Sequence, residues 1–179
     1  MSVVKPNLRV NRIAILGAES SGKSQLAEAL ATHYQTVWVP EYLREFVEQQ
    51  QRVPTEADQL LIAQTQVHRE NALMLEAKNW LFCDTTPSMT ALYSRYYFKA
   101  MDPELARLDL NHEYDFSIVT APDFPWVADG LQRESPAVRQ HIHDELLAML
   151  EEREIPFLLV EGSLAQRLQQ VQFALDFLS

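Results

Sequence analysis

An eight-residue segment, Gly17 to Ser24, has the residue types and spacing of a phosphate-binding loop. It reads Gly-Ala-Glu-Ser-Ser-Gly-Lys-Ser and so fits the pattern Gly-x4-Gly-Lys-Ser/Thr. In that pattern the two glycines let the backbone turn so that successive N–H groups face an anion, and the following helix adds its positive end. We therefore predict that this loop, a P-loop, holds the phosphates of a nucleoside triphosphate.

The side chains at the end of the loop have separate predicted roles. The ammonium of Lys23 should reach the β- and γ-phosphates, and the hydroxyl of Ser24 should ligate Mg²⁺. The alternative is a glycine-containing turn without a ligand, which the flanking strand and helix disfavour. The implied cofactors are ATP and Mg²⁺, and the predicted nucleotide-binding residues are Gly17, Glu19, Ser20, Ser21, Gly22, Lys23, Ser24 and Gln25.

Asp84 is the predicted partner carboxylate of this loop. It ends the apolar run 80–83, which is the Walker B arrangement of a buried strand that delivers a carboxylate to the edge of a sheet. There it would help to bind Mg²⁺ together with Ser24. An Asp in this position can also be only the N-cap of a helix, but a P-loop requires such a carboxylate. Cys83 is expected to be a small buried hydrophobe.

A second polar cluster follows the short apolar run 37–39. Glu41 and Tyr42 come directly after Pro40, with Arg44 and Glu45 on the first turns of an expected helix. A carboxylate here could accept the proton of an attacking hydroxyl, while Arg44 fixes the acceptor or its phosphate. The equally weighted alternative is an acidic residue placed by the helix dipole.

The segment from Trp126 to Arg133 follows the apolar run 116–120 and fits the position of a closing lid. Arg133 and Arg139 would neutralise charge on the transferred phosphoryl group, or they are ordinary exposed helix residues. Trp126 would stack on a flat heterocycle, or it packs the hinge of the lid. His141 and His143 point in different directions on their helix, so we expect no shared metal ion there. We expect both side chains to be exposed to solvent.

Short apolar runs alternate with helical patterns along the chain. The expected strands cover residues 12–16, 37–39, 80–83, 116–120 and 157–160, and the expected helices run from Gly22, over 55–78, over 135–153 and from Ser163. Start signals support two of the helices: Thr55 with Asp58 approximates a capping box, and Ser135 with Pro136 is an N-cap followed by a favoured first residue. This order predicts an α/β fold with a five-stranded parallel sheet, its ligands beyond the carboxyl ends of the strands.

Composition limits the classes of partner. The chain has 179 residues, with 15 Lys and Arg against 25 Asp and Glu, which gives a formal net charge of −10. Such a chain has no broad basic surface for nucleic acid, and its length suits a single domain, 1–179. We find no bilayer-spanning segment and no export signal, and the lone cysteine fits a reducing compartment. We therefore expect a cytoplasmic protein with no membrane or nucleic-acid partner.

Together these motifs resemble the NadR-like P-loop family, labelled AAA-type ATPase, and in it the ribosylnicotinamide kinase domain of bacterial NadR proteins. The resemblance runs nearly end to end. It is carried by the loop 17–24, by Glu41-Tyr42 with Arg44-Glu45, by Asp84-Thr85-Thr86 with the aromatic stretch 93–97, and by 125–130 with Arg133. It implies a P-loop NTPase three-layer sandwich that is nucleoside-kinase-like and carries a lid segment.

The resemblance also implies an activity. It is the ATP-dependent phosphorylation of the ribose 5′-hydroxyl of nicotinamide riboside to give nicotinamide mononucleotide, a step of NAD biosynthesis. The predicted catalytic residues are Lys23, Glu41, Asp84 and Arg133, with the base either Glu41 or Asp84. The predicted acceptor-binding residues are Glu41, Tyr42, Arg44, Trp126 and Asp129, and Trp126 is the candidate platform for the pyridinium ring.

Two other functions stay open at this stage. Another nucleoside or nucleotide kinase would have the same motifs, and so would an ATPase or nucleotide-switch module with a protein partner. A guanine-nucleotide switch is disfavoured because the sequence has no Asn-Lys-x-Asp motif. Some family members carry an upstream adenylyltransferase or DNA-binding domain; with only eleven residues before the first expected strand, we do not carry those activities over.

Overall fold

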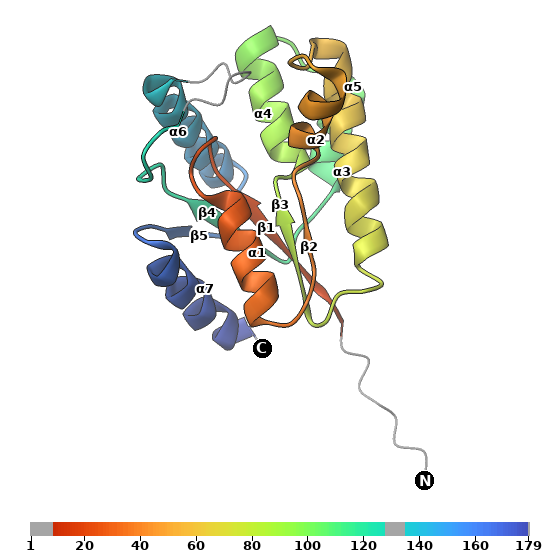
Figure 1. Ribbon diagram of the computed structural model, residues 1–179. Coiled ribbons are helices and arrows are strands. Elements are labelled where there is room, and N and C mark those ends of the chain that lie inside the picture. The colour runs from red at the N-terminus through yellow and green to blue at the C-terminus, as the bar shows by residue number, and fades with distance from the viewer. Residues whose placement is uncertain (1–8, 128–134, 179) are drawn as a thin grey trace.

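The computed structural model describes residues 9–127 and 135–178. Its centre is a parallel sheet in the order β2-β3-β1-β4-β5 (Figure 1). The strands are β1 Asn11–Leu16, β2 Trp38–Val39, β3 Trp80–Asp84, β4 Phe116–Thr120 and β5 Phe157–Val160. All five match the expected apolar runs to within a residue at each end, and the predicted α/β P-loop fold with its five-stranded parallel sheet is confirmed.

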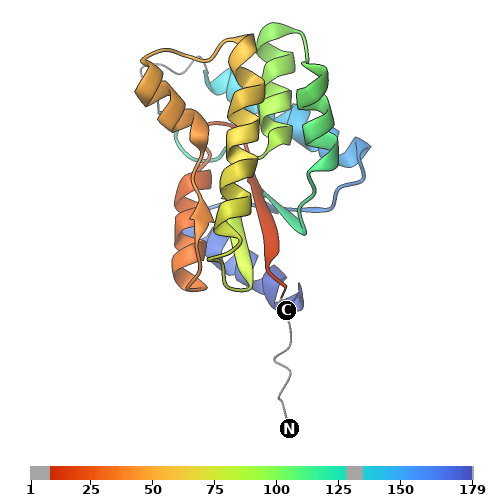
Figure 2. The ribbon, with the colours of Figure 1, turned by 90° about the vertical axis from the view of Figure 1, so that its right-hand side faces the viewer.

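Helices cover both faces of this sheet. They are α1 Lys23–His33, α2 Tyr42–Gln50, α3 Gln59–Leu73, α4 Pro87–Phe98, α5 Pro103–Asn111, α6 Pro136–Glu152 and α7 Leu164–Leu178, with a 3₁₀ turn over Glu56–Asp58. Figure 2 shows α3, α4 and α5 side by side. None of the helices in the two described ranges has the length and apolar character that crossing a membrane requires.

The alternation of side chains along β1 explains how the layers are held. Ile13 and Ile15 point to one face, where they pack with residues of α1 and α7. Ala14 and Leu16 point to the other face, where they pack with α4 and α6. Because both faces bury apolar side chains, β1 reads as a continuous hydrophobic run, as expected of a central parallel strand.

The start signals of two helices are confirmed, and one helix is shorter than predicted. The Thr55 N–H donates to Asp58 Oδ2 at 2.7 Å, and Ser135 Oγ accepts the N–H of Val138 at 3.2 Å. The helix expected over 55–78 divides into the 3₁₀ turn and α3, which ends at Leu73. The residues after Leu73 form a tight turn that leads into β3. The helical spacing of apolar residues in the sequence therefore extends beyond the end of the helix itself.

Two features differ from the sequence-based expectation. The expected elements did not include α4 and α5; α4 buries Met89, Ala91 and Leu92 together with the hydroxyls of Thr90 and Ser94, so its pattern is not a simple apolar stripe. The expectation that His143 is solvated is wrong. It is buried on α6, and burial lowers the pKa of its imidazole.

Candidate nucleotide and acceptor site

A cavity of about 900 Å³ lies at the carboxyl ends of the strands, at the upper range of volumes typical of small-molecule sites. Figure 1 shows α2, α4 and α6 gathered at the same end of the sheet. The lining of the cavity combines the P-loop with residues of α2, α3, α4 and the segment after β4. It includes Gly17, Glu19, Ser20, Gly22, Lys23, Ser24, Gln25, Glu41, Arg44, Gln66, Met89, Tyr93, Tyr97, Phe124 and Pro125.

Two glycines give the P-loop its shape. Gly17 has φ +155° and a Cβ there would lie 2.2 Å from Thr120 Oγ1, while Gly22 has φ +84° and a Cβ there would lie 2.4 Å from Phe124 Cε2. Gly22 is also the N-cap of α1, so the backbone turns there to bring the helix N-terminus to the cavity. Both positions therefore need glycine for their φ angle and for the closeness of the neighbouring segment.

Lys23 lies inside the loop and is 8% exposed. Its Nζ donates to the Ala18 carbonyl at 2.9 Å; an ammonium carries three donors, so this bond uses one of them. The N–H of Glu19 donates to the hydroxyl oxygen of Tyr93 at 3.3 Å, which ties α4 to the loop. Sequence reasoning did not give Tyr93 this role, although it lies in the aromatic stretch 93–97.

Ser24 and Asp84, the two predicted metal ligands, lie next to each other, because β1 and β3 are neighbours and Ile15 pairs with Asp84. Ser24 Oγ donates to Asp84 Oδ2 at 2.5 Å. Asp84 Oδ1 is buried and has no hydrogen-bond partner within the described ranges. An unpartnered buried carboxylate oxygen beside a hydroxyl fits the oxygen ligands that Mg²⁺ takes when phosphates complete its shell.

Burial dominates the electrostatics of Asp84. It raises the pKa of the carboxyl, and the positive charge of Lys23, the hydrogen bond from Ser24 and the charge of Arg44 oppose this increase. A carboxylate held against its solvation preference gains from any cation placed beside it. The site is therefore electrostatically prepared for a metal ion or another positive charge.

The Glu41 cluster divides between the cavity and the surface. Glu41, the N-cap of α2, and Arg44 line the cavity. Glu45 turns to Arg69, whose NH1 lies 2.6 Å from Glu45 Oε2, and Tyr42 lies under the Arg69 guanidinium at 4.7 Å. Among the described residues, Tyr42 does not line the cavity, so its predicted contact with the acceptor stays a prediction.

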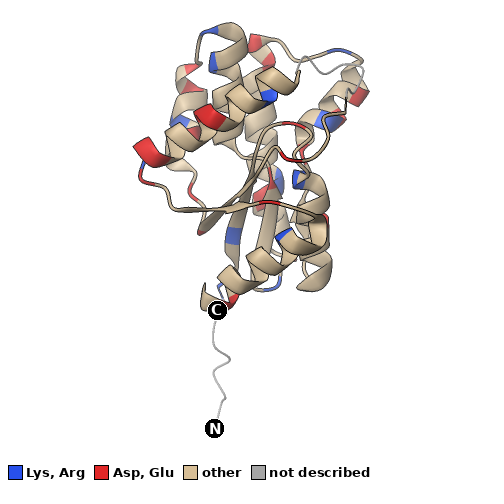
Figure 3. Ribbon diagram, turned by 90° about the vertical axis from the view of Figure 1, so that its left-hand side faces the viewer, with Lys and Arg blue, Asp and Glu red and all other residues tan. Residues whose placement is uncertain are grey.

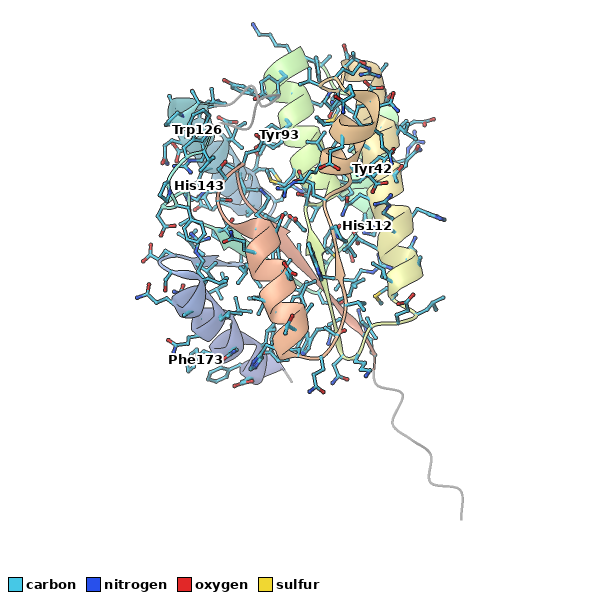
Figure 4. The ribbon with its side chains drawn as sticks, viewed as in Figure 1. Tyr42, Tyr93, His112, Trp126, His143 and Phe173 are labelled. Carbon is cyan, nitrogen blue, oxygen red and sulfur yellow. The ribbon has the colours of Figure 1, made fainter. Side chains whose placement is uncertain are left out.

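Trp126 lies beside α6, at the side of the molecule away from Tyr42, and Tyr93 lies between them in the view of Figure 4. Pro125 and Val127, which flank Trp126 in the sequence, line the cavity. Within the described part of the chain, the indole of Trp126 itself does not. Its Nε1 is buried without a partner in that part. Asp129, Gly130 and Arg133 lie outside the described residues, so their predicted roles stay predictions.

Two buried arginines, Arg139 and Arg167, donate hydrogen bonds to backbone carbonyls of the P-loop. Sequence reasoning did not connect either of them with the loop. Arg167 is fully buried and donates to the carbonyls of Ser21, Ala121 and Gly162, pairs with Asp123, and stacks over Phe124 at 4.0 Å. Arg139 donates to the carbonyls of Ser20 and Phe124 at 3.1 and 2.8 Å. Arg139 therefore positions the loop in this structure. The Ser21 hydroxyl adds a contact with the Thr120 hydroxyl at 2.7 Å.

We expect Gly22→Ala to weaken both the fold and nucleotide binding. The methyl would meet the Phe124 ring at a positive φ, so the free energy of unfolding should fall by about 2 kcal/mol. Displacement of the loop should also lower ATP affinity, measured by titration calorimetry. Gly162→Ala is the matched control, because Gly162 also has a positive φ but its Cβ would meet only the flexible Gln166 side chain. Equal ATP affinity in the two variants would contradict this role.

Arg167→Met should lower the free energy of unfolding by about 3 kcal/mol, because buried carbonyls of three loops lose their donor. Asp123 is partly exposed, so its ion pair is not counted in this value. Arg167→Lys keeps the charge but not the planar guanidinium whose donors reach three separate carbonyls, so it should lose an intermediate amount. Chemical denaturation measures both, and a loss below about 1 kcal/mol for Arg167→Met would show that the carbonyls find other partners.

The fold and this cavity define a P-loop nucleotide-binding protein. The model of a family described as an AAA domain matches residues 12–167. The chain belongs to this AAA-domain family.

Known proteins resemble the chain over most of its length. It is 32% identical over 163 residues to the "Trifunctional NAD biosynthesis/regulator protein NadR" of Escherichia coli strain K12, covering 88% of this chain and 40% of that protein. The chain thus spans well under half the length of this curated relative.

Solved structures share the fold. A NadR protein in complex with NR has a TM-score of 0.77 at 20% identity, over 87% of this chain and 46% of that one. A deoxyadenosine kinase from M. mycoides has a TM-score of 0.66 at 11% identity, over 93% and 99% of the two chains.

Proposed function

We propose that the chain is an ATP-dependent kinase that phosphorylates a nucleoside, with nicotinamide riboside as the candidate acceptor. The observation that carries this proposal is one cavity whose lining includes both the P-loop and Glu41. A motor or a switch needs a P-loop but needs no second organic substrate beside the γ-phosphate. The likeness to NadR, and to a structure described as a NadR protein with NR, supports the choice of acceptor.

The residues of the cavity suit transfer of the γ-phosphoryl group. The N–H groups of the P-loop and Lys23 would hold the phosphates and balance the charge that develops on them. Ser24 and Asp84 would hold Mg²⁺, which neutralises the triphosphate when bound. Glu41 would accept the proton of the acceptor hydroxyl, and Arg44 would orient the acceptor. Asp84 is the less suitable base, since its carboxylate already accepts the Ser24 hydroxyl.

The lining of the cavity suits a cationic ring. It includes Glu48 and two tyrosines, Tyr93 and Tyr97, whose rings are nearly parallel with 6.0 Å between centroids. Aromatic faces and a carboxylate both attract a pyridinium, which nicotinamide riboside carries and ordinary nucleosides lack. Trp126 remains a further predicted platform.

The distribution of charge agrees with small-molecule substrates. In the view of Figure 3, Lys and Arg are interspersed with Asp and Glu over the described helices. A nucleic-acid partner would need basic residues gathered on one face. The cationic groups that matter here, Lys23 and Arg44, are concentrated in the cavity instead.

The decisive experiment incubates the protein with γ-labelled ATP, Mg²⁺ and a panel of nucleosides that includes nicotinamide riboside. The proposal expects label in nicotinamide mononucleotide at the highest kcat/KM of the panel. Preferred transfer to thymidine or adenosine would leave a nucleoside kinase of another specificity. ATP hydrolysis at one rate with and without every nucleoside would replace the proposal with an ATPase.

A further inference from the structure

Gln66 is the buried polar residue on which the relative placement of Glu41 and Asp84 depends. It lies in the middle of α3, is 3% exposed and reaches the edge of the cavity. Its Nε2 donates to the carbonyls of Pro40 and Asp84, both at 3.2 Å, and its Oε1 accepts the N–H of Tyr42 at 2.9 Å. One amide thus uses both donors and its acceptor on the backbones of two segments.

The strand ladder ends where these bonds begin. β2 pairs with β3 only at Trp38 with Phe82 and at Val39 with Cys83. The next residue, Pro40, has no N–H and cannot extend the ladder by donating to its neighbour. Gln66 instead bridges the next carbonyl of each segment, those of Pro40 and Asp84, which continues the link between β2 and β3 beyond their shared ladder.

The bridged backbone positions enclose the two carboxylates of the proposed reaction. Pro40 and Tyr42 flank Glu41, and the third contact is the carbonyl of Asp84 itself. We propose that Gln66 is a positioning residue that holds Glu41 at a fixed separation from Asp84 and the P-loop. This inference rests on the proposed function, because it assigns these carboxylates to the acceptor and to the metal.

The chemistry of the side chain limits what can replace it. A glutamate would turn carboxylate oxygens toward two carbonyl oxygens and lose both donors. A methionine fills nearly the same volume but bonds with none of the three groups. Misplacement of a reacting group by about 1 Å costs about 10²-fold in rate, so loss of the bridge should act on kcat more than on ATP binding.

The experiment compares Gln66→Met, Gln66→Glu and the control Glu70→Gln. Glu70 lies one turn further along α3, is also fully buried, and contacts Arg12, His112 and Tyr114, which lie outside the cavity. Thermal midpoints come first, and rates are then taken well below them. The two Gln66 variants should lose about 10²-fold in kcat, with KM for ATP within about threefold of wild type. Glu70→Gln should lower the midpoint and leave kcat within about threefold.

Hydrogen exchange at the Tyr42 amide gives a readout that does not need activity. Loss of its acceptor should speed this exchange in Gln66→Met and not in Glu70→Gln. If Gln66→Met retains kcat within threefold of an active wild type, or if the Tyr42 exchange is unchanged, the positioning role is overturned. If wild type phosphorylates no nucleoside, the proposed function fails; faster exchange in Gln66→Met then still supports the positioning of this segment. Should Gln66→Met not fold, Gln66→Glu decides by kcat alone, because its carboxylate can still accept the Tyr42 N–H.

Discussion

Lys23→Ala should reduce phosphoryl transfer by about 10³-fold or more, because the ammonium balances charge that develops on the transferred group in the transition state. Lys23 lies within the loop, and its bond in this structure is to the Ala18 carbonyl. The residue lies at the first position of α1 and is not part of the apolar core. We therefore expect a thermal midpoint close to that of wild type.

Steady-state transfer of labelled phosphate and a thermal scan by circular dichroism measure the two parts of this prediction. Lys78→Ala, an exposed lysine outside the cavity, is the control for removal of a positive charge. Turnover of Lys23→Ala within tenfold of wild type would refute the role of the P-loop in transfer. A large fall in its midpoint would show instead that the residue supports the fold.

Asp84→Asn should have opposite effects on activity and stability. Activity should fall by about 10²-fold or more, because an amide does not supply the negative charge that holds Mg²⁺. The thermal midpoint at neutral pH should rise. Burial makes the carboxylate costly and raises its pKa, whereas a neutral asparagine of the same shape keeps an acceptor for Ser24.

The pH dependence follows from the direction of that shift. The folded protein holds the Asp84 proton more tightly than the unfolded chain, so unfolding releases it and stability is lost as the pH rises. The advantage of Asp84→Asn should therefore be absent below the unfolded pKa, near 3.8, should grow as the pH rises from there to the raised folded pKa, and should stay constant above it. Thermal scans across this range test the sign.

A second buried aspartate gives the matched control. Asp109 on α5 is also buried, but Arg153 lies 2.9 Å away and the Ser88 hydroxyl donates to it. Because its charge is paired, Asp109→Asn should lower the midpoint and leave kcat unchanged. If both variants shifted the midpoint in the same direction, burial that outweighs the nearby charges of Lys23 and Arg44 would not be the cause at Asp84.

Helix α3 shows why part of the site escaped prediction. The pattern indicated an apolar stripe of Leu60, Ala63, Val67 and Met74. In the structure the buried face is Gln59, Ile62, Ala63, Gln66 and Glu70. Periodicity assumes that buried positions are apolar. Here Gln66 binds backbone groups at strand ends and Glu70 binds polar side chains, so both are buried with their hydrogen bonds made.

The sequence by itself determined the chemistry of phosphate binding and the strands that carry it. The spacing Gly17 to Ser24 is local, and the apolar runs before it and before Asp84 place both residues at one edge of a parallel sheet. Only the tertiary structure showed which residues fix the backbone at this edge of the sheet. Gln66 contacts Asp84 across 18 positions and Arg167 contacts Ser21 across 146. Their partners are backbone carbonyls, which every residue has. No pattern of residue types in the sequence can therefore predict these contacts.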